Sequence, residues 1–156
     1  MKFKHTSVLL HETIDNLKPK NGGLYVDATF GGGGHAKYLL SKIDTGTLVG
    51  FDQDEYAIKS AKLNFANLLQ LDSEPRLELV HDNFSNLEKD LVKLGYSDGI
   101  DGIYYDLGVS SPQFDQADRG FSYRYDARLD MRMDQSQDLD ACLLYTSDAA
   151  DDMQCV

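Results

Sequence analysis

The sequence lacks several features that would point to particular classes of protein. Tryptophan is absent, and the 156 residues include only three prolines and two cysteines, Cys142 and Cys155. Cysteines this few, and this near the end of the chain, indicate neither a disulfide framework nor a zinc site, and they favour a reducing cytoplasm. Because no apolar run is long enough to cross a bilayer or to act as a secretory signal, we expect a cytoplasmic protein without a membrane partner.

Positive charge is scarce as well. The formal net charge is −11, which argues against a general electrostatic attraction to nucleic acid. Four of the five arginines nevertheless lie within one short segment, at Arg119, Arg124, Arg128 and Arg132. A nucleic-acid partner, if the protein has one, should meet that segment.

Apolar residues and turn residues alternate along the chain in a pattern that predicts strands and helices in turn. We expect strands at 24–30, 47–51, 77–80 and 100–105, and helices at 7–17, 36–43, 55–69 and 87–94. Strand–helix alternation of this kind is typical of an α/β fold with a parallel sheet and helices on both faces. Ligands of such sheets bind beyond the carboxyl ends of the strands.

Four consecutive glycines, Gly31–Gly34, follow the first expected strand and open the next helix. Gly31, Gly33 and Ala36 match the dinucleotide pattern G-x-G-x-x-A, so a nicotinamide-dependent oxidoreductase is one interpretation. Asp27 favours another, because a pyrophosphate gains nothing from an added carboxylate. S-adenosylmethionine does gain from it, since this cofactor has no phosphate and carries a sulfonium and an ammonium group.

Other candidates stand at the remaining strand ends. Asp52 is placed to accept hydrogen bonds from ribose hydroxyls, and we expect Asp54 to cap the following helix. Phe84 follows the third strand, where it is either an adenine contact or a core residue. His35 has no second ligand at a helpful spacing, so we expect no metal, and its backbone N–H at the helix start is its expected contribution. Asp106 ends the fourth strand near the expected reacting centre.

Two segments further along suggest a nucleic-acid base as substrate. Residues 111–114 (SPQF) loosely match the Ser-Pro-Pro-aromatic motif of methyltransferases that act on amino groups of bases, although on these four residues alone a tight surface turn is the favoured interpretation. Residues 119–132 interleave arginines with Phe121, Tyr123 and Tyr125, which suits single-stranded RNA. Nearby aspartates leave an ion-paired loop as the alternative.

Taken together, the stretch DLGVSSPQFDQADRGFSY with the later LDMRMD resembles the bacterial 16S ribosomal RNA cytosine-N4 methyltransferases, the RsmH or MraW family. Residues 5–12 (HTSVLLHE), 27–35 (DATFGGGGH) and 51–54 (FDQD) are similar to the earlier motifs of that family, in the same order. The resemblance extends from about His5 to Asp134.

The resemblance implies a Rossmann-like class I methyltransferase that transfers a methyl group from S-adenosylmethionine to the amino nitrogen of a cytosine in the decoding region of 16S ribosomal RNA, within the small subunit. Its implied cofactor contacts are Gly33, Gly34, His35, Asp52, Phe84, Asp106 and Gln113. Asp106 is also the best candidate for the catalytic group that accepts the amine proton.

Two departures from the family pattern shape our expectations. Asp126–Arg128 replaces an Asp-Gly-Pro, and residues 142–156 match nothing expected of the family. We therefore expect a partial cofactor-binding domain at 1–134, incomplete at its C-terminal end, and a disordered acidic tail at 135–156 that is foreign to the family. A poorly stable, inactive and non-catalytic fragment is the third hypothesis, beside the methyltransferase and the oxidoreductase.

Overall fold

The structure is a computed structural model that describes residues 7–143. The chain divides into two compact units, Met1–Leu107 and Gly108–Val156, and each unit is described by itself. Cys155 and most of the expected tail lie outside the described residues. The predicted domain boundary after residue 134 stays a prediction.

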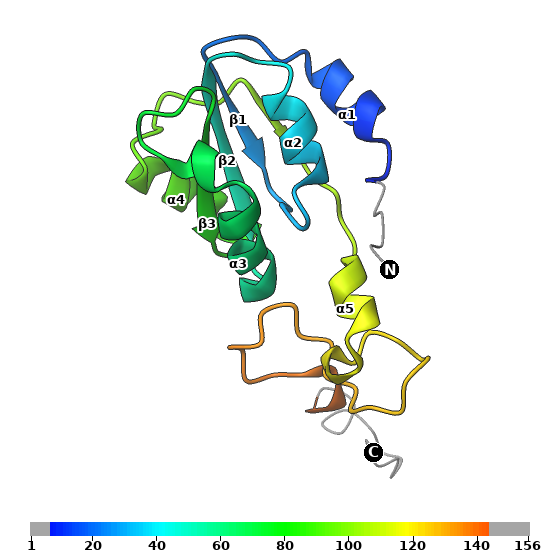
Figure 1. Ribbon diagram of the computed structural model, residues 1–156. Coiled ribbons are helices and arrows are strands. Elements are labelled where there is room, and N and C mark those ends of the chain that lie inside the picture. Colours follow the sequence, from blue (N-terminus) through cyan, green and yellow to red (C-terminus); the bar gives the residue numbers. More distant parts are fainter. Residues whose placement is uncertain (1–6, 144–156) are drawn as a thin grey trace. The chain divides into compact units, whose positions relative to one another are not determined.

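A parallel four-stranded sheet forms the centre of the first unit (Figure 1). Its strands are β1 (Gly23–Asp27), β2 (Gly46–Asp52), β3 (Arg76–His81) and β4 (Gly102–Tyr104), in the order β3-β2-β1-β4. Tyr25 is in register with Leu48, and Leu48 with Leu77, so these buried side chains form one row across the sheet. The predicted parallel α/β fold is confirmed, and all the strand ends that were expected to hold the site face the same edge.

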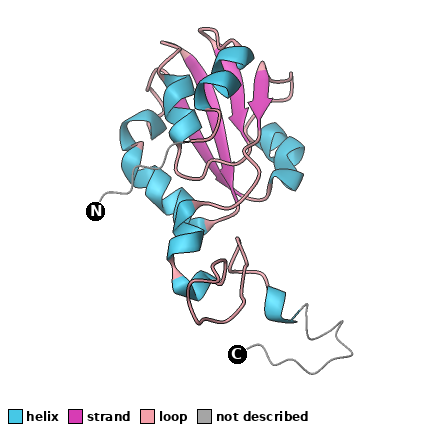
Figure 2. Ribbon diagram, turned by 90° about the vertical axis from the view of Figure 1, so that its right-hand side faces the viewer, coloured by secondary structure: helices cyan, strands magenta, loops and turns pink. Residues whose placement is uncertain are grey.

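Helices cover both faces of this sheet (Figure 2). The first core contains residues of α1 (Leu10–Leu17), α2 (Gly34–Leu40) and α3 (Glu55–Asn64), packed on Tyr25, Leu48 and Leu77. The second core lies on the other face, where Val26, Val49 and Phe51 pack against Leu91 of α4 (Leu87–Lys93). Strands buried on both faces explain why their sequences are almost continuously apolar.

Several predicted elements end earlier than expected, and the contacts at two of these ends explain why. The first strand stops at Asp27 rather than residue 30, because the Asp27 carboxylate accepts the N–H of Thr29 and turns the chain. The helix predicted to reach residue 69 stops at Asn64. Phe65 then leaves helical geometry, its ring packs edge-on against Phe30, and a short 3₁₀ turn (Ala66–Leu69) follows. Here core packing outweighs helical periodicity.

The second unit contains little regular structure among its described residues. A short helix, α5 (Ser111–Asp115), begins with Pro112 in its first turn, and Ser110 and Gln113 form a capping box. A 3₁₀ turn (Ala117–Arg119) follows. Backbone bonds between distant residues then hold the loop, since Met131 N–H donates to the Arg119 carbonyl at 3.0 Å and Cys142 N–H to the Leu129 carbonyl at 2.9 Å. Within residues 7–143, no helix has the length and apolar character that crossing a membrane requires.

Gly50 of β2 tests how tightly the first core is packed. A Cβ at this position would project into the ring of Phe30 and come within 3.3 Å of Leu79. We expect Gly50→Ala to lower the free energy of unfolding by about 1–3 kcal/mol, as over-packing of a core does. Urea unfolding measures the effect. Gly32→Ala is the control, because its Cβ would meet nothing within 4 Å, and an equal loss in both variants would contradict this packing.

Candidate functional site

The carboxyl edge of the sheet brings together the side chains that the sequence singles out. Asp27 and Asp52 are the last residues of β1 and β2, and Asp106 follows β4 by two residues. Phe84 opens a short 3₁₀ turn (Phe84–Asn86) after β3. Parallel pairing places these groups at one edge, with the glycine turn between Asp27 and α2.

Asp27 is the most enclosed of these carboxyls, with 1% of its surface exposed. One carboxylate oxygen accepts the N–H of Thr29 at 3.1 Å, and the other accepts the hydroxyl of Tyr104 at 2.8 Å. Burial, with a smaller contribution from the negative charges of Asp52 and Asp106, raises the pKa of Asp27 to about 7 against the lowering effect of both hydrogen bonds. The group therefore binds and releases a proton near neutral pH.

Asp52 connects the end of β2 to the glycine turn. One of its oxygens accepts the N–H of Gly31 at 2.7 Å, and the other accepts the N–H of Asp54 at 2.8 Å. Burial raises the pKa of Asp52, while these two backbone hydrogen bonds lower it. Each carboxylate oxygen can accept a second hydrogen bond, so both stay able to receive a hydroxyl. Asp54 accepts the N–H of Tyr56 at 2.9 Å and caps α3, which confirms its predicted role.

The glycine turn owes its sequence partly to the core beneath it. Gly33 caps α2 with φ +73°, and a Cβ there would lie 2.7 Å from the ring of Phe65 and 2.9 Å from that of Phe30. A larger residue would be strained in its backbone and would displace two buried rings. The turn can thus approach a ligand closely while its other side packs on the core.

His35 contributes a side chain where only its backbone N–H was expected. The imidazole is buried, with 7% of the residue exposed. Its Nε2 lies 3.0 Å from the carbonyl oxygen of Val8, and its Nδ1 lies 3.8 Å from Oδ2 of Asp106. The backbone N–H of Asp106 donates to Thr29 Oγ1 at 2.7 Å, so Asp106 is near His35 through its side chain and is bound to Thr29 through its backbone.

Phe84 keeps 38% of its surface exposed, and its ring packs edge-on against Tyr105 at a centroid distance of 5.6 Å. An exposed aromatic pair at the ends of β3 and β4 favours a ligand contact over a core role for Phe84. Next to it, Asn83 donates to Gln53 Oε1 at 2.7 Å and so connects the ends of β3 and β2.

These residues fit S-adenosylmethionine in type. The negative charges of Asp52 and Asp106 lie close enough to raise the pKa of Asp27, and a sulfonium or ammonium group would offset that effect. Asp52 offers acceptors for ribose, and Phe84 offers a ring for adenine. A pyrophosphate would add negative charge to the same edge, so a dinucleotide fits poorly.

Gln113, the remaining predicted cofactor contact, belongs to the second unit. It is buried at α5, where its Oε1 accepts the N–H of Ser110 at 2.9 Å. Its role toward a cofactor stays a prediction.

A surface cavity of about 690 Å³ lies beside the glycine turn, between α2 and the end of α3. It includes Gly33 and Gly34, but Asp52, Phe84 and Asp106 do not line it. The polar residues at the strand ends and this cavity therefore indicate two different places for a ligand. We assign the candidate site to the strand ends, because ligands of parallel sheets bind at the carboxyl edge.

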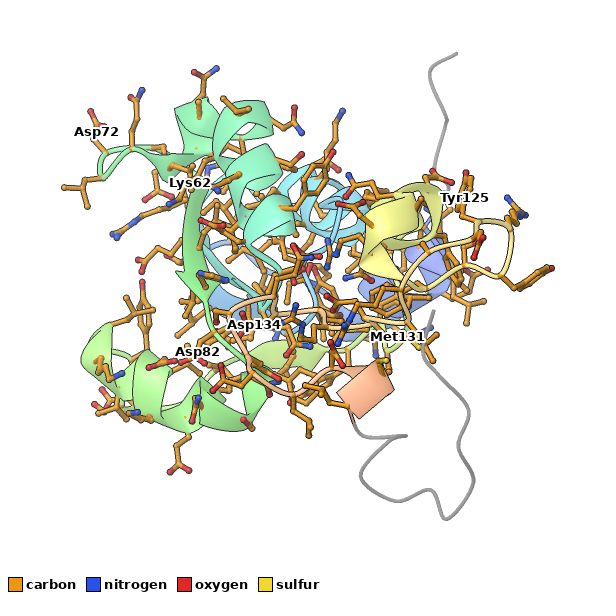
Figure 3. The ribbon with its side chains drawn as sticks, turned by 90° about the horizontal axis from the view of Figure 1, so that it is seen from below. Lys62, Asp72, Asp82, Tyr125, Met131 and Asp134 are labelled. Carbon is orange, nitrogen blue, oxygen red and sulfur yellow. The ribbon has the colours of Figure 1, made fainter. Side chains whose placement is uncertain are left out.

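The arginine segment is largely ion-paired within the second unit. Arg128 donates to Asp140 at 2.7 Å, Arg132 binds both oxygens of Asp130, and the buried Arg119 donates to the carbonyls of Arg132 and Met133. The predicted ion-paired loop is therefore present. Arg124 and the neighbouring Tyr123, which is 98% exposed, are available to a partner. Figure 3 shows this segment from below, with Tyr125, Met131 and Asp134 labelled.

Sequence reasoning missed Tyr104, Thr29 and Val8 as parts of the site. Tyr104 is the last residue of β4 and stands two residues before Asp106. Because residues two apart in an extended chain lie on one side, this spacing is a signal that the sequence offers for Tyr104. Thr29 and Val8 act through contacts with residues distant in the sequence, and no local pattern marks them.

The chain is similar to known proteins of one family. A model of the MraW methylase family matches residues 2–154. The chain is 94% identical to the Ribosomal RNA small subunit methyltransferase H of Lactobacillus helveticus over 141 residues, which are 90% of the chain and 45% of that protein. The protein of the same name from Lactobacillus acidophilus is 91% identical over the same shares, and that from Oenococcus oeni is 56% identical over 89% of the chain and 43% of its own length. The chain thus spans less than half the length of these relatives.

The buried Asp27 carboxyl predicts a particular pH dependence of stability. Its pKa is about 7 in the folded chain and 3.8 when exposed, so the folded state holds a proton that the unfolded state has lost between these values. The free energy of unfolding should therefore fall as pH rises through this window, with a slope of up to about 1.4 kcal/mol per pH unit.

Asp27→Asn removes this titration and should flatten the slope between pH 4 and 7 in chemical unfolding. Arg132 lowers the pKa of Asp130, so Asp130 changes the free energy of unfolding only below this pH window and does not obscure the slope within it. Tyr104→Phe is the matched control, since it removes a hydrogen bond that lowers the pKa of Asp27 and should keep the slope. Equal slopes in wild type and Asp27→Asn would contradict the raised pKa.

Proposed function

The chain belongs to the MraW methylase family, and from this premise we propose that the protein containing it transfers a methyl group from S-adenosylmethionine to ribosomal RNA of the small subunit. The observation that carries the proposal is the edge of the sheet, where three carboxyls surround a glycine turn. The relatives from Lactobacillus are named Ribosomal RNA small subunit methyltransferase H, and this name supports the same reaction and substrate.

We further propose that the acceptor is the exocyclic N4 of a cytosine in the decoding region of 16S ribosomal RNA. Support comes from the motif at Asp106–Phe114, which resembles those of enzymes that methylate this kind of amine. The amine is a poor nucleophile because its lone pair is delocalised into the ring, so acceptors for its N–H groups help the reaction.

Each residue of the site then has a distinct role. Bound S-adenosylmethionine supplies an electrophilic methyl group on a positively charged sulfur. Asp52 accepts hydrogen bonds from the ribose, Gly33, Gly34 and the backbone of His35 approach the cofactor, and Phe84 contacts adenine. Asp106 accepts the proton that the amine releases. Gln113 stays a predicted cofactor contact on the strength of the resemblance alone.

Binding of S-adenosylhomocysteine to the chain tests the cofactor assignment. Calorimetry should detect binding to the wild type, and Asp52→Asn should weaken it about tenfold or more through loss of charged acceptors. Asp54→Asn is the matched control, because asparagine caps a helix as well as aspartate and should leave the affinity unchanged.

NADH serves as the competing ligand. Binding of NADH in preference to S-adenosylhomocysteine would support the oxidoreductase instead, and absence of binding to either would support a non-catalytic fragment. The nicotinamide alternative gains no support from the relatives.

The reaction itself is tested with a full-length enzyme that carries this segment, incubated with unmethylated small subunits and labelled cofactor. Digestion of the RNA and mass spectrometry should identify N4-methylcytidine. A methyl group on another base, or none, would overturn the proposed acceptor.

The same assay tests the arginine segment. Tyr123→Ala and Arg124→Ala should each raise the KM for subunits about fivefold or more, because one base stacked on an aromatic contributes at least ~1 kcal/mol. Tyr56→Ala and Lys62→Ala are matched controls at exposed positions of α3 and should leave the KM unchanged. Figure 3 shows Lys62. If the control variants change the KM as much as Tyr123→Ala and Arg124→Ala do, then this segment does not contact the RNA.

A further inference from the structure

The contacts of His35 go beyond what a helix-opening backbone N–H would need. The imidazole is buried in the first turn of α2, and both of its nitrogens face specific partners. Nε2 lies 3.0 Å from the carbonyl oxygen of Val8, in the segment before α1, and Nδ1 lies 3.8 Å from Oδ2 of Asp106, after β4.

The Val8 contact determines the tautomer. A carbonyl oxygen only accepts hydrogen bonds, so the nitrogen that faces it, Nε2, carries the proton. In a neutral ring the lone pair is then on Nδ1, which lies 3.8 Å from Oδ2 of Asp106. A lone pair does not bind an ionised carboxylate, but it accepts a hydrogen bond from a protonated carboxyl, so Nδ1 becomes a partner of Asp106 once Asp106 has taken up a proton.

The surroundings offer Asp106 no other base of this kind among the described contacts. Its backbone N–H is held by Thr29 Oγ1, while half of its carboxyl is open to solvent. Tyr104, whose ring lies 5.7 Å from that of His35, directs its hydroxyl to Asp27 rather than to Asp106. Asp106 also lies close enough to Asp27 for its negative charge to raise the pKa of the Asp27 carboxyl.

We propose that the His35 side chain is a positioning residue for methyl transfer: once Asp106 has received the proton of the amine, Nδ1 of His35 accepts a hydrogen bond from the Asp106 carboxyl, which orients that carboxyl and shares its proton. The inference rests on the proposed function. As the new C–N bond forms and the C–S bond of the cofactor breaks, one N–H bond of the amine breaks and its proton passes to Asp106 Oδ2. The lone pair of His35 Nδ1 is the next base within reach, so the proton is held between the two side chains until solvent removes it.

Nitrogen-15 spectra of the chain test the geometry without substrate. We expect His35 to show the neutral tautomer with the proton on Nε2, and Asp106→Asn to shift the Nδ1 resonance while leaving Nε2 unchanged. A proton on Nδ1 of the neutral ring, or an Nδ1 resonance that ignores Asp106→Asn, would overturn the inference. This outcome does not depend on methyl transfer, so it is separate from a failure of the proposed function.

Two substitutions in a full-length enzyme separate the two contacts. His35→Gln can keep a donor to Val8 but lacks the group facing Asp106, whereas His35→Asn keeps an amide near the Nδ1 position and cannot reach Val8. We expect His35→Gln to lower kcat about 100-fold, within the usual effect of a proton-transfer group, with the KM for cofactor changed less than about threefold. His35→Asn should retain more kcat, and both should flatten the dependence of kcat on pH.

His11→Gln on the exposed face of α1 is the control and should leave kcat unchanged. Thermal unfolding of each variant identifies a loss of structure. If His35→Gln lowers kcat no more than His11→Gln does, or changes only the KM for cofactor, then His35 does not position Asp106.

Discussion

The structure of this site depends on carboxyl groups that the parallel strands bring to one edge. Asp27, Asp52 and Asp106 end or follow neighbouring strands, and the negative charges of Asp52 and Asp106 raise the pKa of Asp27. Backbone N–H groups bind Asp52, the Tyr104 hydroxyl and the Thr29 N–H bind Asp27, and about half of the Asp106 carboxyl stays open to solvent. Such an edge is prepared for a ligand that brings positive charge and hydroxyl groups.

The same contacts hold the glycine turn in place. The Gly31 N–H donates to the Asp52 carboxylate, the Thr29 N–H donates to the Asp27 carboxylate, and the backbone N–H of Asp106 donates to the Thr29 hydroxyl. The carboxyls of Asp27 and Asp52 are therefore also part of the scaffold, whereas Asp106 holds the turn through its backbone and leaves its carboxyl free of this task. Variants that remove a charge should be compared with variants that preserve the same hydrogen bonds, because loss of binding alone does not separate the two roles.

Much of this could be predicted from the sequence. Strand–helix alternation indicated the parallel sheet, and the acidic residues at the strand ends indicated its functional edge. Local rules also placed Asp54 correctly as a helix cap. The sequence was less informative where long-range packing decides: Phe65 ends α3 by packing on Phe30, and the His35 ring contacts Val8 and Asp106 rather than its sequence neighbours. The family resemblance predicted a set of cofactor contacts, which stays a prediction, while the contacts of Tyr104 and Thr29 could be found only in the structure.

Mapping of backbone amide shifts while S-adenosylhomocysteine is added tests the central claim most directly. If the carboxyl edge is the binding site, the largest shifts will occur at Asp52, Phe84 and Asp106, together with the glycine turn. Shifts concentrated instead at residues 64–68, which line the cavity beside α3, would contradict the account, because that ligand would be bound by shape without the three carboxyls.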